Sequence, residues 1–114
     1  INTRYREQLA DLEAVGFMPW DVRGRPNGWL TVITLDPAAL SPAELCKALD
    51  VHDIEARPAW KPMHLQPVFA DAPCLGGEVA EDLFARGVCL PSGSAMSDAD
   101  QDRVVEAVRE ALRG

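Results

Sequence analysis

The 114-residue sequence has little positive charge and no long apolar run. Its 11 lysines and arginines stand against 18 acidic residues, and they are scattered. A net charge of -7 argues against a nucleic-acid-binding face, which needs clustered basic residues. The longest apolar stretch, Trp29–Leu35, is far shorter than the ~20 residues that cross a bilayer. We therefore expect a soluble protein with neither a nucleic-acid nor a membrane partner.

Cysteine and histidine are also scarce. The three cysteines, Cys46, Cys74 and Cys89, are odd in number and widely spaced, which excludes an ordinary disulfide framework. Together with His52 and His64 they lack the C-x-x-C or H-x₃₋₅-H spacing of a zinc site, so no metal is expected. The first residues have no apolar segment typical of a signal peptide. These features indicate reduced, mostly buried thiols in a cytoplasmic protein.

The elements that remain predict one α+β fold, a small mixed or antiparallel sheet of about three strands packed with helices. The Trp29–Leu35 stretch, apolar on both faces, is expected to be a central strand. Ser41 and Ser97 each begin a sequence typical of a helix N-cap. Val79, Leu83 and Phe84 are expected to face inward from their helix. The expected helices are 1–16, 42–49, 77–86 and one that begins after 97; the expected strands are 29–35, 54–57 and 88–90.

Residues 56–69, "ARPAWKPMHLQPVF", follow neither helical nor strand periodicity. Their three prolines restrict the backbone and lower the entropy lost in holding one shape. Arg57 offers a planar fork for carboxylate or phosphate, Trp60 a flat apolar face, and His64 a group that can donate or accept. The segment is either the wall of a binding site or a proline-rich connection whose Trp and His pack on the surface.

Catalytic patterns are absent. No nucleophile-elbow sequence accompanies either histidine, so a Ser or Cys nucleophile is not expected. Lys61 lies between Trp60 and Pro62, where an activated amine is conceivable, but no neighbour in the sequence would desolvate it. Lys47 lies on a capped helix and is expected to face solvent. No residue of the chain is therefore predicted to be catalytic.

The same stretch, together with "GGEVAEDLFARGVCLPSGSAMSDADQDRVVEAV", resembles the C-terminal part of the DegT/DnrJ family of sugar aminotransferases. Within that family it is most similar to the bacillosamine-type enzymes, which make amino sugars on nucleotide-activated hexoses. "INTRYREQLADLEAVGFMP" resembles the helix that leads out of the large domain, and "NGWLTVITLD" the first strand of the small domain. The resemblance thus assigns residues 1–16 to the connecting helix and 17–114 to the small C-terminal domain.

The resemblance implies a homodimeric fold-type I enzyme dependent on pyridoxal 5'-phosphate. Such enzymes transfer an amino group, usually from glutamate, to a keto-sugar attached to a nucleotide diphosphate. The family's Schiff-base lysine and the aspartate that pairs with the pyridine nitrogen belong to the large domain, and neither Lys47 nor Lys61 matches that lysine's motif. The chain alone is therefore expected to bind no cofactor and to be inactive, and in the enzyme to close the mouth of the active site.

The resemblance also implies which side chains contact the substrate. His64 matches the family's histidine that reaches the sugar or the cofactor region. Two alternatives stay open: a stand-alone ligand-binding or regulatory module that reuses this domain without catalysis, and a purely structural or dimerising domain. The remaining substrate-binding residues implied by the match are Arg57, Trp60, Lys61, Gln66, Asn27 and Trp29.

Overall fold

A computed structural model describes all 114 residues, Ile1–Gly114. It contains four α-helices and one antiparallel sheet with the strand order β1-β2-β4-β3, which confirms the predicted α+β class. No helix combines the length and the apolar content needed to cross a membrane. The elements are α1 (Asn2–Gln8), β1 (Val15–Phe17), β2 (Thr31–Leu35), α2 (Pro42–Asp50), β3 (Arg57–Pro58), the 3₁₀ helices η1 (Met63–Leu65) and η2 (Pro67–Phe69), α3 (Glu78–Arg86), β4 (Gly87–Leu90) and α4 (Asp98–Arg113).

The two central strands, β2 and β4, form the middle of the sheet. They pair in antiparallel register with Ile33 opposite Val88, and all four residues of β4 are buried. The central position predicted for the Trp29–Leu35 stretch is therefore confirmed, although the strand begins at Thr31. Burial on both faces explains why its sequence is continuously apolar and β-branched rather than alternating.

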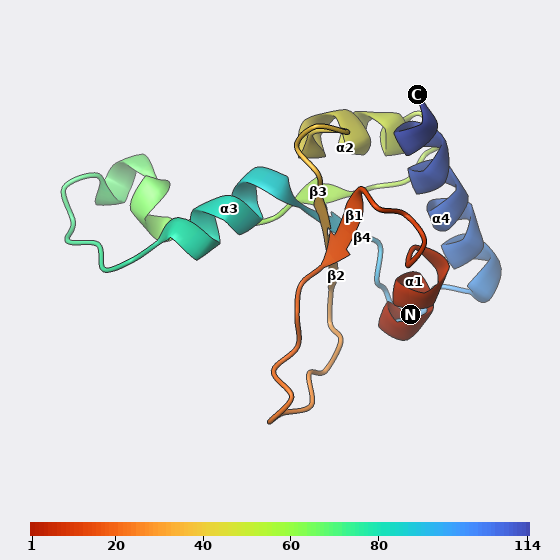
Figure 1. Ribbon diagram of the computed structural model, residues 1–114, viewed down its shortest axis with the longest axis horizontal. Helices are drawn as coiled ribbons and strands as arrows, with labels where there is room; N and C mark the ends of the chain where they lie inside the picture. Colours follow the sequence, from red (N-terminus) through yellow and green to blue (C-terminus); the bar gives the residue numbers. More distant parts are fainter.

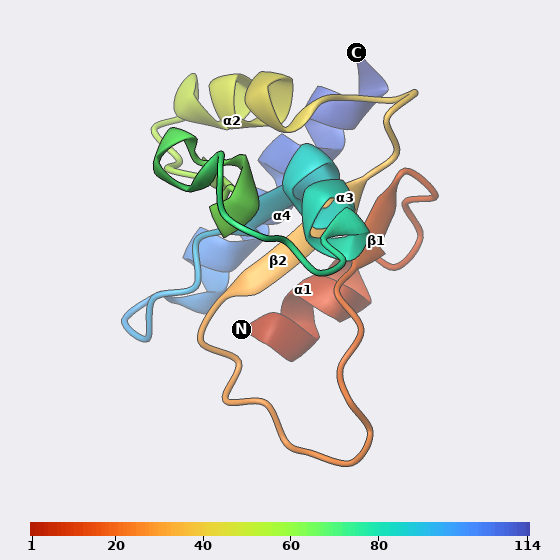
Figure 2. The same ribbon diagram turned by 90° about the vertical axis from the view of Figure 1, so that its left-hand side faces the viewer.

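One side of the sheet is covered by α1, α2 and α4, as Figures 1 and 2 both show. The predicted caps are present: Ser41 and Ser97 each accept the backbone N–H of the residue three positions on, and that residue's carboxylate accepts the cap's own N–H. The caps fix where α2 and α4 begin, and the spacing of their apolar residues decides which face of each helix turns inward. The resulting core consists of Tyr5, Leu9, Ile33, Leu35, Leu45, Leu49, Ile54, Val88, Leu90, Val104, Val105, Ala107 and Val108.

The first helix is shorter than predicted, and the sheet has a strand that the sequence did not reveal. The helix ends at Gln8, and Val15–Phe17 forms β1 against β2. Gly16 was expected to stop a helix; a Cβ at that position would lie 2.6 Å from the Thr34 hydroxyl oxygen, so its lack of a side chain lets β1 approach β2. The prediction was wrong because helical spacing of the apolar residues up to Val15 also suits a short strand after a turn. The division of the chain at residue 16 stays a prediction.

The third strand is also displaced from its expected position. It comprises Arg57 and Pro58, opposite Cys89 and Val88 of β4, rather than residues 54–57. Proline was expected to end it, but Pro58 is tolerated because β3 is the edge strand and needs no donor on its outer side.

Residues 60–86 form an arm that extends from the opposite side of the sheet, carrying η1, η2 and α3 (Figure 1). From Met63 to Arg86 no residue is buried. The Cα radius of gyration of 15.0 Å exceeds the roughly 13 Å expected of a compact chain of this length. The predicted inward position of Val79 on α3 is therefore wrong, since its side chain is 74% exposed, whereas Leu83 and Phe84 are half-buried.

The cysteines are free, but they are not uniformly buried. Cys89 is buried in β4, Cys46 is half-buried on α2, and burial raises the pKa of both thiols. Both are thus held in the unreactive protonated form at neutral pH. Cys74, on the arm, is exposed, contrary to the expectation of mostly buried thiols.

The base of the arm is a close contact between Ala59 and Gly87. The Ala59 amide donates to the Gly87 carbonyl oxygen at 2.8 Å. A Cβ on Gly87 would lie 2.7 Å from the Ala59 Cβ and 2.3 Å from the Leu83 carbonyl oxygen. Glycine is required here for space, because the outgoing and returning segments of the arm meet at this point.

We expect Gly87→Ala to lower the free energy of unfolding by about 1–3 kcal/mol, the usual cost of overpacking. The contact is with backbone and a Cβ, neither of which can rotate away. Urea unfolding followed by far-UV circular dichroism measures the change. Gly93→Ala is the matched control, since a Cβ there meets no atom within 4 Å; equal stability of the two variants would contradict the assignment.

Candidate functional site

The residues predicted to bind substrate lie in two places. Trp29, Asn27, Arg57 and Trp60 surround the end of the sheet, where β2, β3 and β4 meet the loop before β2. His64 and Gln66 lie farther out on the arm, and Lys61 connects the two groups along the chain. The structure thus brings four of the seven together at the sheet end and leaves the other three farther along the arm.

Two tryptophans face each other across the sheet end. The ring centroids of Trp29 and Trp60 are 6.5 Å apart and the rings are tilted by 33°. They remain 72% and 66% exposed, respectively. Paired aromatic rings that keep so much surface in water offer flat faces on which a planar or apolar ligand surface can stack.

Trp60 also lines a cavity of about 640 Å³, the aromatic recess. At its rim Arg57 donates to one Glu55 carboxylate oxygen from Nε at 2.9 Å and from Nη2 at 2.5 Å. These hydrogen bonds hold the pKa of the Arg57 guanidinium above its ordinary value. The pair is largely exposed and so contributes little to stability, which leaves Arg57 able to turn to a ligand anion. The recess is lined by Leu30, Glu55, Arg57, Pro58, Trp60, Cys89, Leu90, Pro91 and Ser92.

A second cavity, of about 910 Å³, adjoins the aromatic recess, with Leu30 and Ser92 lining both. The loop between β1 and β2 forms one wall, the first residues of the chain a second, and the turn Ser92–Ser94 a third. Asn27 and Trp29 line it, and the Asn27 side-chain oxygen accepts the Trp29 backbone N–H at 3.1 Å. Asn27 therefore orients the backbone that carries Trp29.

That loop extends away from the sheet (Figures 1 and 2), yet its first part is anchored. The Arg6 guanidinium lies over the rings of Phe17 and Trp20, at 4.8 Å and 4.5 Å from the centroids, and donates to the Met18 carbonyl oxygen at 2.7 Å. Cation–π contacts of this kind each contribute about 0.5–1 kcal/mol at exposed positions. Sequence reasoning missed Arg6, because the contact depends on a turn that the sequence pattern did not show.

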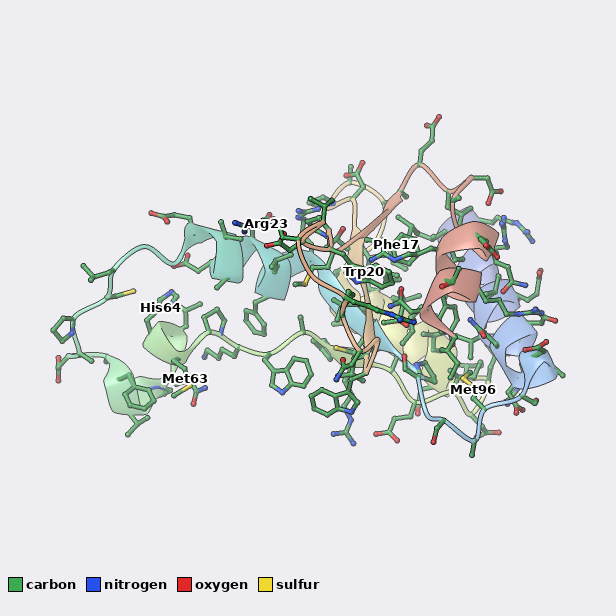
Figure 3. The ribbon with its side chains drawn as sticks, turned by 90° about the horizontal axis from the view of Figure 1, so that it is seen from below. Phe17, Trp20, Arg23, Met63, His64 and Met96 are labelled. Carbon is green, nitrogen blue, oxygen red and sulfur yellow. The ribbon has the colours of Figure 1, made fainter.

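His64 projects from η1 toward α3. Its Nε2 lies 2.8 Å from the Glu81 Oε1, and its side chain is 22% exposed. Figure 3 shows His64 beside Met63 on the arm, well apart from Phe17 and Trp20. His64 lines neither of the two cavities. Sequence reasoning missed Glu81. An acidic residue in the first turn of a helix is common, so its position gives no sign of the contact with His64.

The two weaker predictions on the arm have few contacts. The Gln66 amide nitrogen lies 3.5 Å from the Met63 sulfur, a weak interaction. Lys61 is exposed and lines neither cavity. Lys47, the other lysine, lies in the last turn of α2 and also lines neither.

The fold and this site define a domain of a known enzyme class. The chain belongs to the DegT/DnrJ/EryC1/StrS aminotransferase family, whose model matches residues 1–109. It is 48% identical over 112 residues to the Bacillus subtilis protein named "Putative pyridoxal phosphate-dependent aminotransferase EpsN", covering 95% of this chain and 29% of that protein. It is 31% identical over 90 residues to GDP-perosamine synthase of Caulobacter vibrioides, covering 78% and 24%.

A solved structure shares the fold. The enzyme DesI, crystallised in the presence of its TDP-sugar product, superposes with a TM-score of 0.83 at 30% identity, covering 99% of this chain and 30% of that one. The chain thus spans less than a third of the length of these relatives. The resemblance inferred from the sequence is confirmed, and the family implies pyridoxal phosphate as the cofactor of the full-length enzyme.

The chain's own residues do not form a pyridoxal phosphate site. Such a site needs a lysine that reaches the cofactor, and neither Lys47 nor Lys61 lines a cavity described above. We therefore expect the cofactor's lysine to come from elsewhere in the full-length enzyme. The expectation that the chain alone binds no cofactor stays a prediction.

We expect Trp60→Ala to change the free energy of unfolding by less than ~0.5 kcal/mol, because the side chain is mostly exposed. The same substitution should shift the fluorescence of Trp29, whose neighbouring ring is removed. Leu35→Ala, in the core, is the control and should cost about 2–5 kcal/mol. A loss with Trp60→Ala as large as in that control would show that Trp60 is a packing residue, not a ligand-facing one.

Proposed function

We propose that this chain is the substrate-closing C-terminal domain of a longer sugar aminotransferase. The enzyme would transfer an amino group from glutamate to a keto-sugar linked to a nucleotide. Family membership supports aminotransfer, and the aromatic recess supports the substrate class. The observation that carries the proposal is the exposed Trp29–Trp60 pair beside the Arg57 guanidinium, on a domain of this family.

Each group at the sheet end matches one chemical part of such a substrate. The two tryptophan rings provide flat faces for a nucleobase or for the apolar face of a hexose. The Arg57 guanidinium provides a fork of N–H donors for a phosphate, which would replace the exposed Glu55 carboxylate as its partner. Asn27, through its bond to the Trp29 backbone, keeps one of the two rings in place.

On the arm, His64 is the proposed contact to the sugar, with Lys61 and Gln66 flanking it. Its imidazole can donate or accept near neutral pH, which suits a hydroxyl or a carbonyl oxygen. The enzyme's other parts would bring the reacting carbon to it, since His64 lines neither cavity of this chain. Pyridoxal phosphate, bound by those other parts, supplies the electron sink for the transfer.

The exposed apolar side chains of the arm favour the interpretation that another part of the enzyme covers this domain. Leu75 is fully exposed, and Val68, Val79 and Met63 are 78%, 74% and 60% exposed. From Met63 to Arg86 the arm has no buried residue and gains little from its own packing, so its order depends on contacts with something else. We infer that the large domain, in a homodimer of the full enzyme, provides that contact.

The exposed arm also favours a second candidate, a stand-alone module that binds a ligand or dimerises without catalysis. The two functions differ in what precedes residue 1. A coding sequence for a large domain with a cofactor lysine supports the aminotransferase; a start codon adjacent to Ile1 supports the module.

In the full-length enzyme, we expect His64→Ala to lower kcat/KM for a keto-sugar by about tenfold or more, the cost of a hydrogen bond to a polar substrate group. The absorbance of the bound cofactor should stay near normal. The assay uses glutamate as donor and GDP- and TDP-linked keto-hexoses as acceptors, and is read by chromatography of the amino-sugar product.

His52→Ala is the matched control for this variant. His52 lies after α2, where its Nε2 is 3.6 Å from Glu110 on α4. It should therefore leave turnover unchanged. Turnover unaffected by His64→Ala would remove His64 from the substrate site.

A further inference from the structure

We propose that Glu81 is the positioning residue of His64, fixing which imidazole nitrogen carries the proton and which is presented to the substrate. This inference rests on the proposed role of His64 in the sugar site. Glu81 itself has no proposed contact with substrate. It acts through the orientation and tautomer of the histidine.

The contact joins two elements of the arm that are distant in sequence. His64 belongs to η1 and Glu81 to the first turn of α3, 17 residues later, and their side chains meet at 2.8 Å. The histidine is 22% exposed and the glutamate 51%. The histidine is thus the more shielded partner, and the carboxylate remains in contact with water.

Gly77 holds the imidazole from a second direction. Its φ of 127° belongs to the region that favours glycine, and a Cβ there would lie 2.9 Å from His64 Cε1 and 3.0 Å from Nε2. The ring therefore rests directly against the backbone at residue 77. The Cys74 sulfur lies 3.6 Å from the same Cβ position and closes that side. Held by a carboxylate and by backbone, the ring has one preferred orientation.

Glu81 is the acid of α3 that meets this ring. Asp82, the next residue, is occupied by Arg86, with hydrogen bonds of 2.8 and 2.5 Å. Glu78, in the same first turn, is exposed and makes no hydrogen bond or ion pair with another side chain. Glu78 is therefore a matched position on the same helix that differs in lacking the contact.

The carboxylate determines the tautomer. An ionised carboxylate can only accept hydrogen bonds, so the His64 Nε2 that faces Glu81 must carry a proton. In the neutral ring Nδ1 then has a free lone pair, and no group of this chain bonds it. Carboxylates orient catalytic and ligating histidines by the same physics. His64 would thus present Nδ1 to the sugar, as an acceptor for a hydroxyl.

The test uses the full-length enzyme labelled with ¹⁵N-histidine, comparing wild type, Glu81→Gln and the control Glu78→Gln. Imidazole ¹⁵N shifts report which nitrogen is protonated. Wild type and Glu78→Gln should show His64 protonated at Nε2. Glu81→Gln should show a mixture, because an amide can either donate or accept.

Kinetics on the GDP- and TDP-linked keto-hexoses complete the test. Glu81→Gln should lower kcat/KM roughly tenfold, and much less when His64 is already alanine, because the two act as one unit. Gly77→Ala should displace the ring and lower kcat/KM in the same way. An unchanged tautomer or unchanged kcat/KM in Glu81→Gln would overturn the positioning role, provided that His64→Ala slows the reaction.

The two proposals fail differently. If His64→Ala leaves turnover intact, the substrate role of His64 is wrong, and the positioning role with it, whatever the ¹⁵N shifts show. If His64→Ala slows turnover but Glu81→Gln adds an equal loss in the His64→Ala background, Glu81 acts independently of the histidine and the inference is wrong.

Discussion

The arm depends on one close approach, between Ala59 and Gly87 at the edge of the sheet. The 2.8 Å hydrogen bond there joins the outgoing segment to the returning one, and only a residue without a Cβ leaves room for it. Trp60 follows directly on one side and α3 precedes directly on the other. This contact thus helps to fix where Trp60 and His64 lie relative to the sheet. Gly87 therefore influences the geometry of the candidate site, although no substrate contact is proposed for it.

The chain combines a packed part with an unpacked arm. The core beneath α1, α2 and α4 is a closed unit, whereas the arm exposes Leu75 and Val79 to water. A domain that ordered such an arm alone would lose conformational entropy with little burial in return. This imbalance agrees with a chain that spans less than a third of the length of its relatives. It also agrees with the proposal that the exposed groups at the sheet end and on the arm meet other parts of a longer enzyme.

Much of the fold was predictable because it follows local rules. Capping sequences at Ser41 and Ser97 identified α2 and α4, and the continuous apolar run identified β2. The strand at Val15–Phe17 was not predictable, because three residues are too few to show an alternating pattern. Gly16 allows β1 to approach β2 closely and does not end a helix. At the site, the residue types of 56–69 left open whether the segment is a binding wall or a proline-rich connection. Partners from other elements, such as Glu81, are set by tertiary contacts that no spacing in the sequence reveals. The family resemblance supplied the proposed function, which composition left open.

The central claim is that this chain contributes substrate contacts while the cofactor's lysine lies elsewhere in the enzyme. Borohydride reduction of the full-length enzyme loaded with pyridoxal phosphate, followed by peptide mapping, tests it directly, because reduction fixes the cofactor covalently to its lysine. The account predicts a single labelled lysine outside these 114 residues. A label on Lys47 or Lys61 would contradict it.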